Sequence, residues 1–151
     1  MSVCTFIASD APLKEVSPSK NYPIEIDIDH GTVNDGGADD NFFLRHFPDV
    51  SCYTKKSYGV SLEWYYTEGR AERIICYIKD ALKQTDCIEL WTVWLMEYYE
   101  FDERPVYYRK VISSSELSIE HIAWIDKAEI WNNPDKMYPN RPSFYCLEIR
   151  K

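Results

Sequence analysis

Residues 58–95 read YGVSLEWYYTEGRAERIICYIKDALKQTDCIELWTVWL, and the period of their hydrophobic pattern changes twice. Over residues 58–66 large apolar or aromatic residues occupy every second position, which is typical of an amphipathic strand. Over residues 68–83 apolar residues recur every three or four positions, which predicts a helix with one apolar stripe. Residues 87–95 are apolar on both faces, as in a central strand. A strand, a helix and a second strand predict two parallel strands of one sheet joined by a helical crossover.

Patterns on either side of this unit extend the predicted sheet. Residues 3–8 predict a short buried strand near the N-terminus. Residues 106–112 predict a further strand that forms an antiparallel hairpin with 87–95, and residues 143–149 predict a closing strand. The sheet is therefore expected to be mixed.

The helices are delimited by polar caps. Thr67 is expected to cap the long helix, and Ser118 a short helix that runs through Ile125. The basic residues of the long helix, among them Arg70 and Arg73, are expected to lie outside its apolar stripe. The predicted fold class is α+β: a single mixed β-sheet with one long helix and one or two short helices packed on it. Residues 1–151 are expected to form a single globular domain.

The negative charge of the chain is concentrated in residues 25–40. This segment holds six of the 25 acidic residues and none of the 17 basic ones, in a chain whose net charge is −8. Ile24, Ile26 and Ile28 alternate with carboxylates, which predicts a strand with its isoleucine face in the core and its acidic face in water. A charge so localised attracts cations, either a metal ion or a basic protein surface.

Two functions fit this acidic segment. Its candidate partner-binding residues are Asp27, Asp29, Asp35, Asp39 and Asp40. The alternative is a small metal-binding domain or enzyme, because carboxylate oxygens suit calcium and magnesium. However, the spacing lacks the register of an EF-hand loop, and alternate residues on one strand face lie about 6.6 Å apart. A solvated edge or partner surface is therefore preferred, and no metal ligand or cofactor is assigned.

A second acidic cluster spans residues 97–103 and interleaves carboxylates with aromatic rings. Its candidate partner-binding residues are Glu97, Tyr98, Tyr99, Glu100 and Asp102. Tyrosine provides contact area, while carboxylates steer and pair with the Arg or Lys of a basic partner. A solvated hairpin tip whose rings fold back onto the sheet explains the pattern equally well.

Charge and motif content argue against several functions. Proteins bind nucleic acids and anionic membranes through an excess of Lys and Arg, and this acidic chain has no such excess. No apolar run approaches the ~20 residues of a membrane span. The chain has no P-loop, G-x-S-x-G, G-x-G-x-x-G or H-E-x-x-H motif, so no catalytic residue is assigned. Glu63 and Glu89 could face one another as an acid–base pair, although solvent-facing strand positions explain them as well.

Five cysteines are scattered along the chain without a C-x-x-C pair: Cys4, Cys52, Cys76, Cys87 and Cys146. Four of them lie in apolar runs, so buried, reduced and non-catalytic thiols are expected. The N-terminal residues lack the basic and long apolar regions of a signal peptide. Cytoplasmic localisation is therefore expected.

The run WTVWLMEYYE at residues 91–100 combines aromatic and acidic side chains within a small acidic α+β chain. In this general character the chain resembles the small immunity proteins of bacterial polymorphic toxin systems. The resemblance implies a cytoplasmic inhibitor that binds a toxin domain, often a basic nuclease, and masks its active site. The expected function is therefore binding of a basic protein rather than catalysis. A subunit whose exposed Tyr and Trp residues form a homo-oligomer is a third hypothesis.

Overall fold

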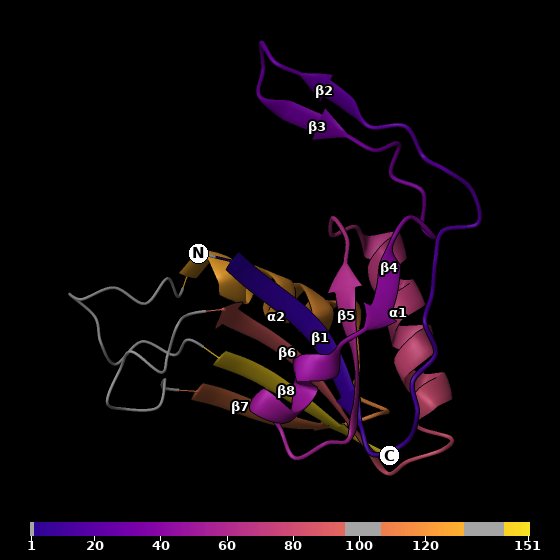
Figure 1. Ribbon diagram of the computed structural model, residues 1–151, viewed down its shortest axis with the longest axis vertical. Helices are drawn as coiled ribbons and strands as arrows, with labels where there is room; N and C mark the ends of the chain where they lie inside the picture. The colour runs from indigo at the N-terminus through magenta and orange to yellow at the C-terminus, as the bar shows by residue number, and fades with distance from the viewer. Residues whose placement is uncertain (1, 96–106, 132–143) are drawn as a thin grey trace, which may run out of the picture.

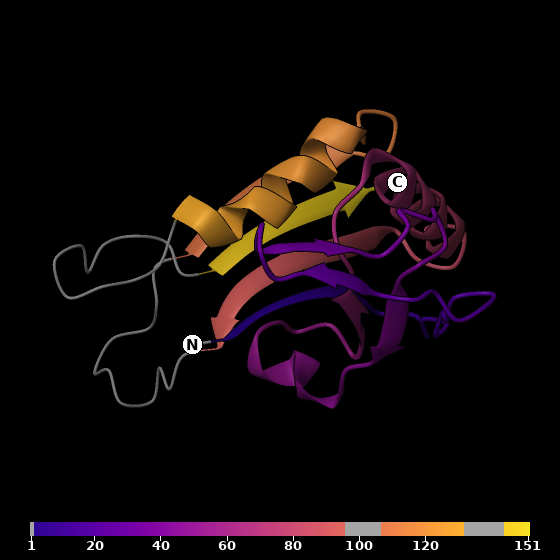
Figure 2. The ribbon, with the colours of Figure 1, turned by 90° about the horizontal axis from the view of Figure 1, so that it is seen from above.

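A six-stranded mixed β-sheet with two helices on one face forms the body of the protein (Figures 1 and 2). The computed structural model describes residues 2–95, 107–131 and 144–151. The strand order is β4-β5-β1-β6-β8-β7. The strands are β1 Ser2–Ser9, β4 Phe43–His46, β5 Tyr58–Glu63, β6 Cys87–Leu95, β7 Tyr107–Ser113 and β8 Phe144–Arg150. The predicted α+β class and mixed sheet are confirmed.

The strand–helix–strand unit has the predicted arrangement. Helix α1 (Glu68–Ala81) follows β5 and precedes β6. Both strands pair antiparallel with β1, which lies between them, so β5 and β6 are parallel to each other. Thr67 caps α1, because its side chain accepts a hydrogen bond of 3.1 Å from the backbone N–H of Arg70.

Three features differ from the sequence prediction. β7 is not the hairpin partner of β6, because β8 lies between them, antiparallel to β6 and parallel to β7. Helix α2 (Ile119–Trp131) has 13 residues against 14 in α1, so it is not short. A second, two-stranded sheet consists of β2 (Glu25–Asp27) and β3 (Thr32–Asn34). Neither helix, nor any other in the described ranges, is long and apolar enough to cross a membrane.

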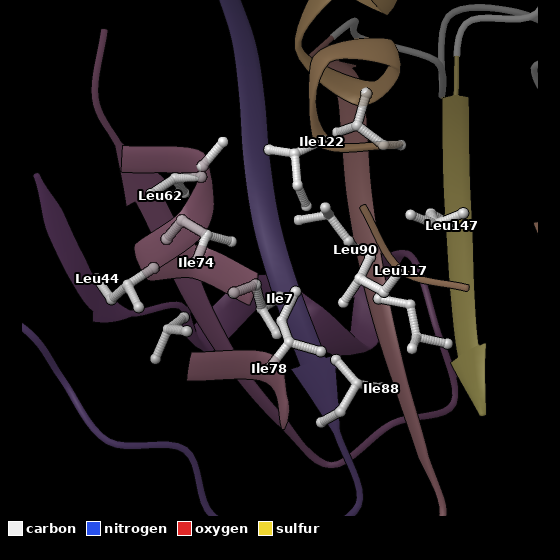
Figure 3. Close-up of a cluster of buried hydrophobic side chains, with 14 of the residues drawn as sticks. Ile7, Leu44, Leu62, Ile74, Ile78, Ile88, Leu90, Leu117, Ile122 and Leu147 are labelled. Carbon is white, nitrogen blue, oxygen red and sulfur yellow. The ribbon is translucent and has the colours of Figure 1, made fainter. Parts of the chain in front are cut away.

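The main hydrophobic core lies between the sheet and the two helices (Figure 2). The predicted stripe of α1 lies in this core, with Ala71, Ile74, Ile78 and Leu82 buried. Burying each of the larger side chains contributes about 1.5–3 kcal/mol relative to leaving it in water. Figure 3 shows ten labelled members of the cluster: Ile7, Leu44, Leu62, Ile74, Ile78, Ile88, Leu90, Leu117, Ile122 and Leu147.

A smaller hydrophobic cluster lies on the opposite face of the sheet, under a 3-10 helix, η1 (Pro48–Cys52) (Figure 2). Phe6, Trp91 and Cys146 are buried there, and the rings of Phe6 and Trp91 stack with centroids 5.9 Å apart. Trp91 is therefore a core residue, as expected for a central strand.

The five cysteines are all free, but they are not all buried. Cys146 is buried, and Cys4 and Cys87 are partly buried. Burial raises the pKa of Cys4 to about 11 and also raises the pKa values of Cys87 and Cys146. Cys52 in η1 and Cys76 in α1 are exposed, so the expectation of burial is wrong for these two.

We expect two of the five thiols to react in the native protein. Cys52 and Cys76 are accessible, whereas the other three thiols are shielded and hold their protons more tightly. Titration with a chromogenic disulfide reagent should show a fast phase of two equivalents, and all five thiols after denaturation. The double variant C52S/C76S serves as control. A fast phase that survives in this variant would contradict the prediction.

Candidate protein-binding surface

A β-hairpin projects away from the body of the protein (Figure 1). Residues 24–34, which comprise β2, β3 and the turn between them, are called the arm below. In the arm Ile26 is paired with Val33, so these two side chains share one face. Ile24 directly precedes β2 and Ile28 is the first residue of the turn that follows it, so both flank this face.

This apolar face of the arm is exposed to solvent. The exposed fractions are 61% for Ile24, 68% for Ile26, 87% for Ile28 and 50% for Val33. The prediction that the isoleucine face lies in the core is therefore wrong: the hairpin extends beyond the sheet instead of packing on it (Figure 1). Leaving each isoleucine in water forgoes about 1.5–3 kcal/mol. A contiguous apolar surface of this kind is typical of sites that another protein covers.

The other face of the arm is acidic. Glu25 and Asp27 alternate with the isoleucines, Asp29 lies in the turn, and all three are exposed. Asp27 accepts a hydrogen bond of 3.1 Å from the backbone N–H of His30, and its second oxygen lies 2.8 Å from Nδ1 of that residue. These hydrogen bonds lower the pKa of Asp27, so its carboxylate is ionised at neutral pH. The arm is therefore apolar on one face and negative on the other.

Two further carboxylates of the predicted segment are engaged at the base of the arm. Asp35 lies 2.8 Å from Nη1 of Arg70, and this hydrogen bond lowers the pKa of Asp35. Asp40 accepts hydrogen bonds from the backbone N–H of Ser19 (2.9 Å) and from the hydroxyl of Tyr22. Ser19 and Tyr22 together hold the pKa of Asp40 well below its usual range. Both carboxylates therefore stabilise the fold around the arm.

Arg70 links the base of the arm to helix α1, and its side chain is 0% exposed. Its Nε donates to the carbonyl of Ala38, and its Nη1 donates to the carbonyl of Tyr65, both at 2.9 Å. The prediction that Arg70 lies outside the buried stripe is wrong. Two features of the sequence could have indicated the burial of Arg70. It directly precedes the apolar Ala71, and residues 35–40 carry an excess of carboxylates that a buried cation could pair with.

Asp39 lies against the first turn of α1. A Cβ added to Gly69 would come within 1.9 Å of Oδ1 of Asp39, so glycine leaves the room that this carboxylate occupies. A negative charge near the N-terminus of a helix is favoured by the helix dipole. Asp39 is exposed, and its position suits both helix stabilisation and contact with a partner.

The carboxylates of residues 25–40 thus do not converge on one point. Within the ranges 2–95, 107–131 and 144–151, no three or more His, Cys, Asp or Glu residues form a group that could hold a metal ion. The second predicted cluster lies outside the described residues and stays a prediction: Glu97, Tyr98, Tyr99, Glu100 and Asp102.

A groove with a volume of about 590 Å³ lies at the base of the arm. Ile24 lines it and also belongs to the apolar face of the arm, so the two surfaces are continuous. Aromatic and charged side chains make up much of the remaining lining: Tyr22, Phe43, Trp64, Tyr65, Lys20, Asp35 and Glu63. The sequence pattern does not reveal this groove, because its lining comes from three separate segments of the chain.

A separate charged cluster lies on the face of the sheet that the helices leave uncovered. Arg109 of β7 donates to Glu89 of β6 (3.0 Å) and, through Nε, to Glu148 of β8 (2.6 Å). Thr54 Oγ1 and Trp91 Nε1 donate to the second oxygen of Glu89 at 2.6 and 2.9 Å. Glu89 and Glu148 are both buried, whereas the side chain of Arg109, which holds them together, is 32% exposed.

Each oxygen of these two carboxylates accepts a hydrogen bond. The second oxygen of Glu148 accepts one of 2.8 Å from Nε of Arg150. Burial raises the pKa of Glu148, but the hydrogen bonds from Arg150 and Arg109 outweigh burial and lower the pKa overall. Glu148 is therefore ionised and paired at neutral pH. This cluster stabilises the sheet edge and is not arranged for proton transfer.

The suggested acid–base pair of Glu63 and Glu89 is wrong. The sheet register pairs Leu62 with Thr5 and Glu89 with Ala8, which places the two glutamates toward opposite ends of β1. Glu63 is exposed, and its Oε2 lies 3.5 Å from Nε of Arg45.

Comparison with protein-family models, with curated proteins and with solved structures found no match to this chain. The geometry of the arm and of the groove is therefore the basis of the functional conclusion.

Proposed function

We propose that this chain is a cytoplasmic protein-binding module whose arm docks onto a basic partner, as an inhibitor of the immunity-protein kind would. The observation that carries the proposal is the exposure of Ile24, Ile26 and Ile28 along a projecting hairpin. The isoleucine row has the pattern of a strand that contributes to a core, yet the described chain leaves it in water. A partner surface would bury these isoleucine side chains.

Burial of this row would contribute a large part of the binding free energy. Each isoleucine removed from water contributes about 1.5–3 kcal/mol. Affinity also depends on what association costs in entropy, so the apolar row acts as an anchor rather than as the whole interface.

The charge of the arm indicates the chemistry of the partner. Glu25, Asp27 and Asp29 are exposed beside the isoleucine row, and the chain carries a net charge of −8. Such a surface attracts a basic protein and accelerates its association. A second copy of this acidic chain would bring like charges together, so a basic partner suits the arm better than a homo-oligomer. Free thiols at all five cysteines support a reducing compartment such as the cytoplasm.

The metal or enzyme alternative receives less support from the same residues. Asp35 and Asp40 are already held by Arg70, Ser19 and Tyr22, so they act within the fold. The remaining carboxylates point to a binding surface.

The test starts by identifying the partner and then measures its kinetics with purified proteins. A tagged chain captures partners from the native lysate, and the recovered protein is identified, purified and injected over the immobilised chain. We expect a basic partner whose affinity falls roughly 30- to 1,000-fold in the variant I26S/I28S, because about 2–4 kcal/mol of apolar burial is lost. We also expect association to slow near ~0.5 M salt, where the Debye length is about 4 Å.

Matched variants separate the arm from general surface effects. Val111 on β7 is also exposed (48%), so V111S removes a comparable apolar side chain elsewhere and should leave binding unchanged. E25Q/D29N should slow association, whereas E72Q on the exposed face of α1 should not. Substituting Asp35 is unsuitable for this purpose, because it would break the contact with Arg70. Equal affinities of I26S/I28S and V111S for the purified partner would overturn the proposal.

A further inference from the structure

We propose that the groove at the base of the arm receives an arginine side chain of the partner. This inference rests on the proposed function, since it specifies which chemical group of a basic protein is recognised. Three observations support it: the aromatic lining, the exposed carboxylate at the rim, and the continuity of the groove with the isoleucine row of the arm.

The aromatic lining suits a planar cation. Tyr22, Phe43, Trp64 and Tyr65 all line the groove. A guanidinium group stacks on aromatic faces, where it is attracted by the negative charge of the ring and is desolvated more easily than an ammonium group. The groove is therefore better matched to arginine than to lysine.

The chain itself places cations on two of these rings. Nζ of Lys20 lies 5.4 Å from the ring centroid of Tyr22, and Cζ of Arg45 lies 4.4 Å from that of Phe43. The folded protein thus already holds a cation against two of the four rings, which shows that they attract cations, and an incoming guanidinium would exchange with Arg45 at Phe43. Lys20 lines the groove, so it would compete with an incoming guanidinium for the ring of Tyr22.

Glu63 provides the carboxylate for the incoming guanidinium. It is paired across the sheet with Phe43 and is exposed at the groove, 3.5 Å from Nε of Arg45. Asp35 also lines the groove, but its charge is compensated by the buried Arg70. The contact between Glu63 and Arg45 is exposed and therefore weak, so it can be exchanged for a contact with the partner.

The position of Ile24 indicates which kind of partner segment would bind. Because Ile24 belongs both to the groove and to the apolar face, a segment lying along Ile26 and Ile28 leads directly into the groove. The recognised segment therefore carries apolar side chains next to an arginine. Apolar contacts would anchor it, and the arginine would fix its register.

The primary test needs no partner. N-acetyl-arginine amide is titrated into the ¹⁵N-labelled protein, with N-acetyl-citrulline amide, which has the same shape without the charge, as matched probe. Arginine should shift the indole N–H of Trp64 and the backbone amides of residues 19–24, 41–43 and 63–65, whereas citrulline should not. Equal shifts with both probes, or arginine shifts confined to other surfaces, would overturn the inference.

Variants then separate the charge from the rings. E63Q and Y65L should each weaken arginine binding roughly two- to fivefold, because the carboxylate or an aromatic face is lost. K20M should strengthen it by removing the competing cation. Y58L and E72Q alter a comparably exposed tyrosine and glutamate away from the groove and serve as controls. Arginine binding that is the same in E63Q, Y65L and the two controls would contradict the assignment.

The outcomes distinguish this inference from the proposed function. I26S/I28S should lose the partner but keep the arginine-specific shifts, because Ile26 and Ile28 do not line the groove. If the arginine shifts are absent while I26S/I28S still weakens partner binding, the groove assignment fails and the proposed function stands. If arginine binds but the arm variant retains full affinity for the purified partner, the proposed function fails instead.

Discussion

Replacing Arg109 with methionine is expected to lower the free energy of unfolding at pH 7 by about 1.5–3 kcal/mol, the range for lost hydrogen bonds to charged groups. Arg109 is the shared cation of the buried carboxylates Glu89 and Glu148. Methionine preserves much of the apolar stem but leaves two carboxylates close together, of which Glu148 keeps its contact with Arg150. A typical domain is stable by only about 5–15 kcal/mol, so this change should be visible as a large shift of the urea midpoint.

The pH dependence of the R109M variant provides a second readout. In the native protein the pKa of Glu148 is lowered, so its contribution to stability is present at neutral pH and is lost as the pH falls through that lowered pKa. Without Arg109, burial favours the protonated carboxyl group. The deficit of R109M relative to the native protein should therefore be largest at pH 7 and shrink toward pH 4.

Two controls accompany this experiment. K110M changes the neighbouring exposed cation of β7 and should alter the free energy of unfolding by no more than about 1 kcal/mol. R109M/E148Q removes one of the two neighbouring negative charges and should recover part of the lost stability, since Glu89 keeps its hydrogen bonds from Thr54 and Trp91. A urea midpoint of R109M that equals that of K110M at pH 7 would show that the cluster does not stabilise the fold.

Replacing Arg70 with methionine is expected to cost about 2–5 kcal/mol of stability and to loosen the base of the arm. The fully buried side chain of Arg70 donates to the carbonyls of Ala38 and Tyr65 and pairs with Asp35. Methionine can donate no hydrogen bond, so the carbonyls of Ala38 and Tyr65 and the carboxylate of Asp35 each lose the one from Arg70. Urea unfolding measures the global effect, and amide hydrogen exchange at residues 36–38 measures the local one.

The matched control for R70M is R73M on the same helix. Arg73 is exposed, so its replacement should change the free energy of unfolding by less than about 0.5 kcal/mol. D35N keeps the shape of the carboxylate without its charge and should produce a smaller loss than R70M. If the amide hydrogens of residues 36–38 exchange at the same rate in R70M and in R73M, Arg70 does not hold the base of the arm.

The local elements of this fold could be predicted from the sequence. Residues 58–95 carry a pattern of period two, then one of 3.6, then a continuous apolar run, and Thr67 precedes the helix as a cap. These signals depend on residues that are close along the chain. The helix α1, its buried stripe and the strands on either side of it therefore follow from the sequence alone.

Pairings between distant segments could not be predicted in the same way. The closing strand β8 lies between β6 and β7, and the sequence predicted a hairpin of β6 with β7 because they are adjacent along the chain. The cluster of Glu89, Arg109 and Glu148 exists only because these three strands meet in that order. The alternation of charged and apolar residues marks each glutamate as a strand residue and says nothing of its partner.

The candidate site shows the same division. The sequence by itself determined that residues 25–40 are acidic and that Ile24, Ile26 and Ile28 alternate with carboxylates. Only the tertiary structure decided that this strand leaves the sheet as a projecting hairpin, and that Arg70 is buried to hold its base. The physical reason is that side-chain periodicity defines which residues share a face, whereas burial depends on whether a distant segment packs against that face.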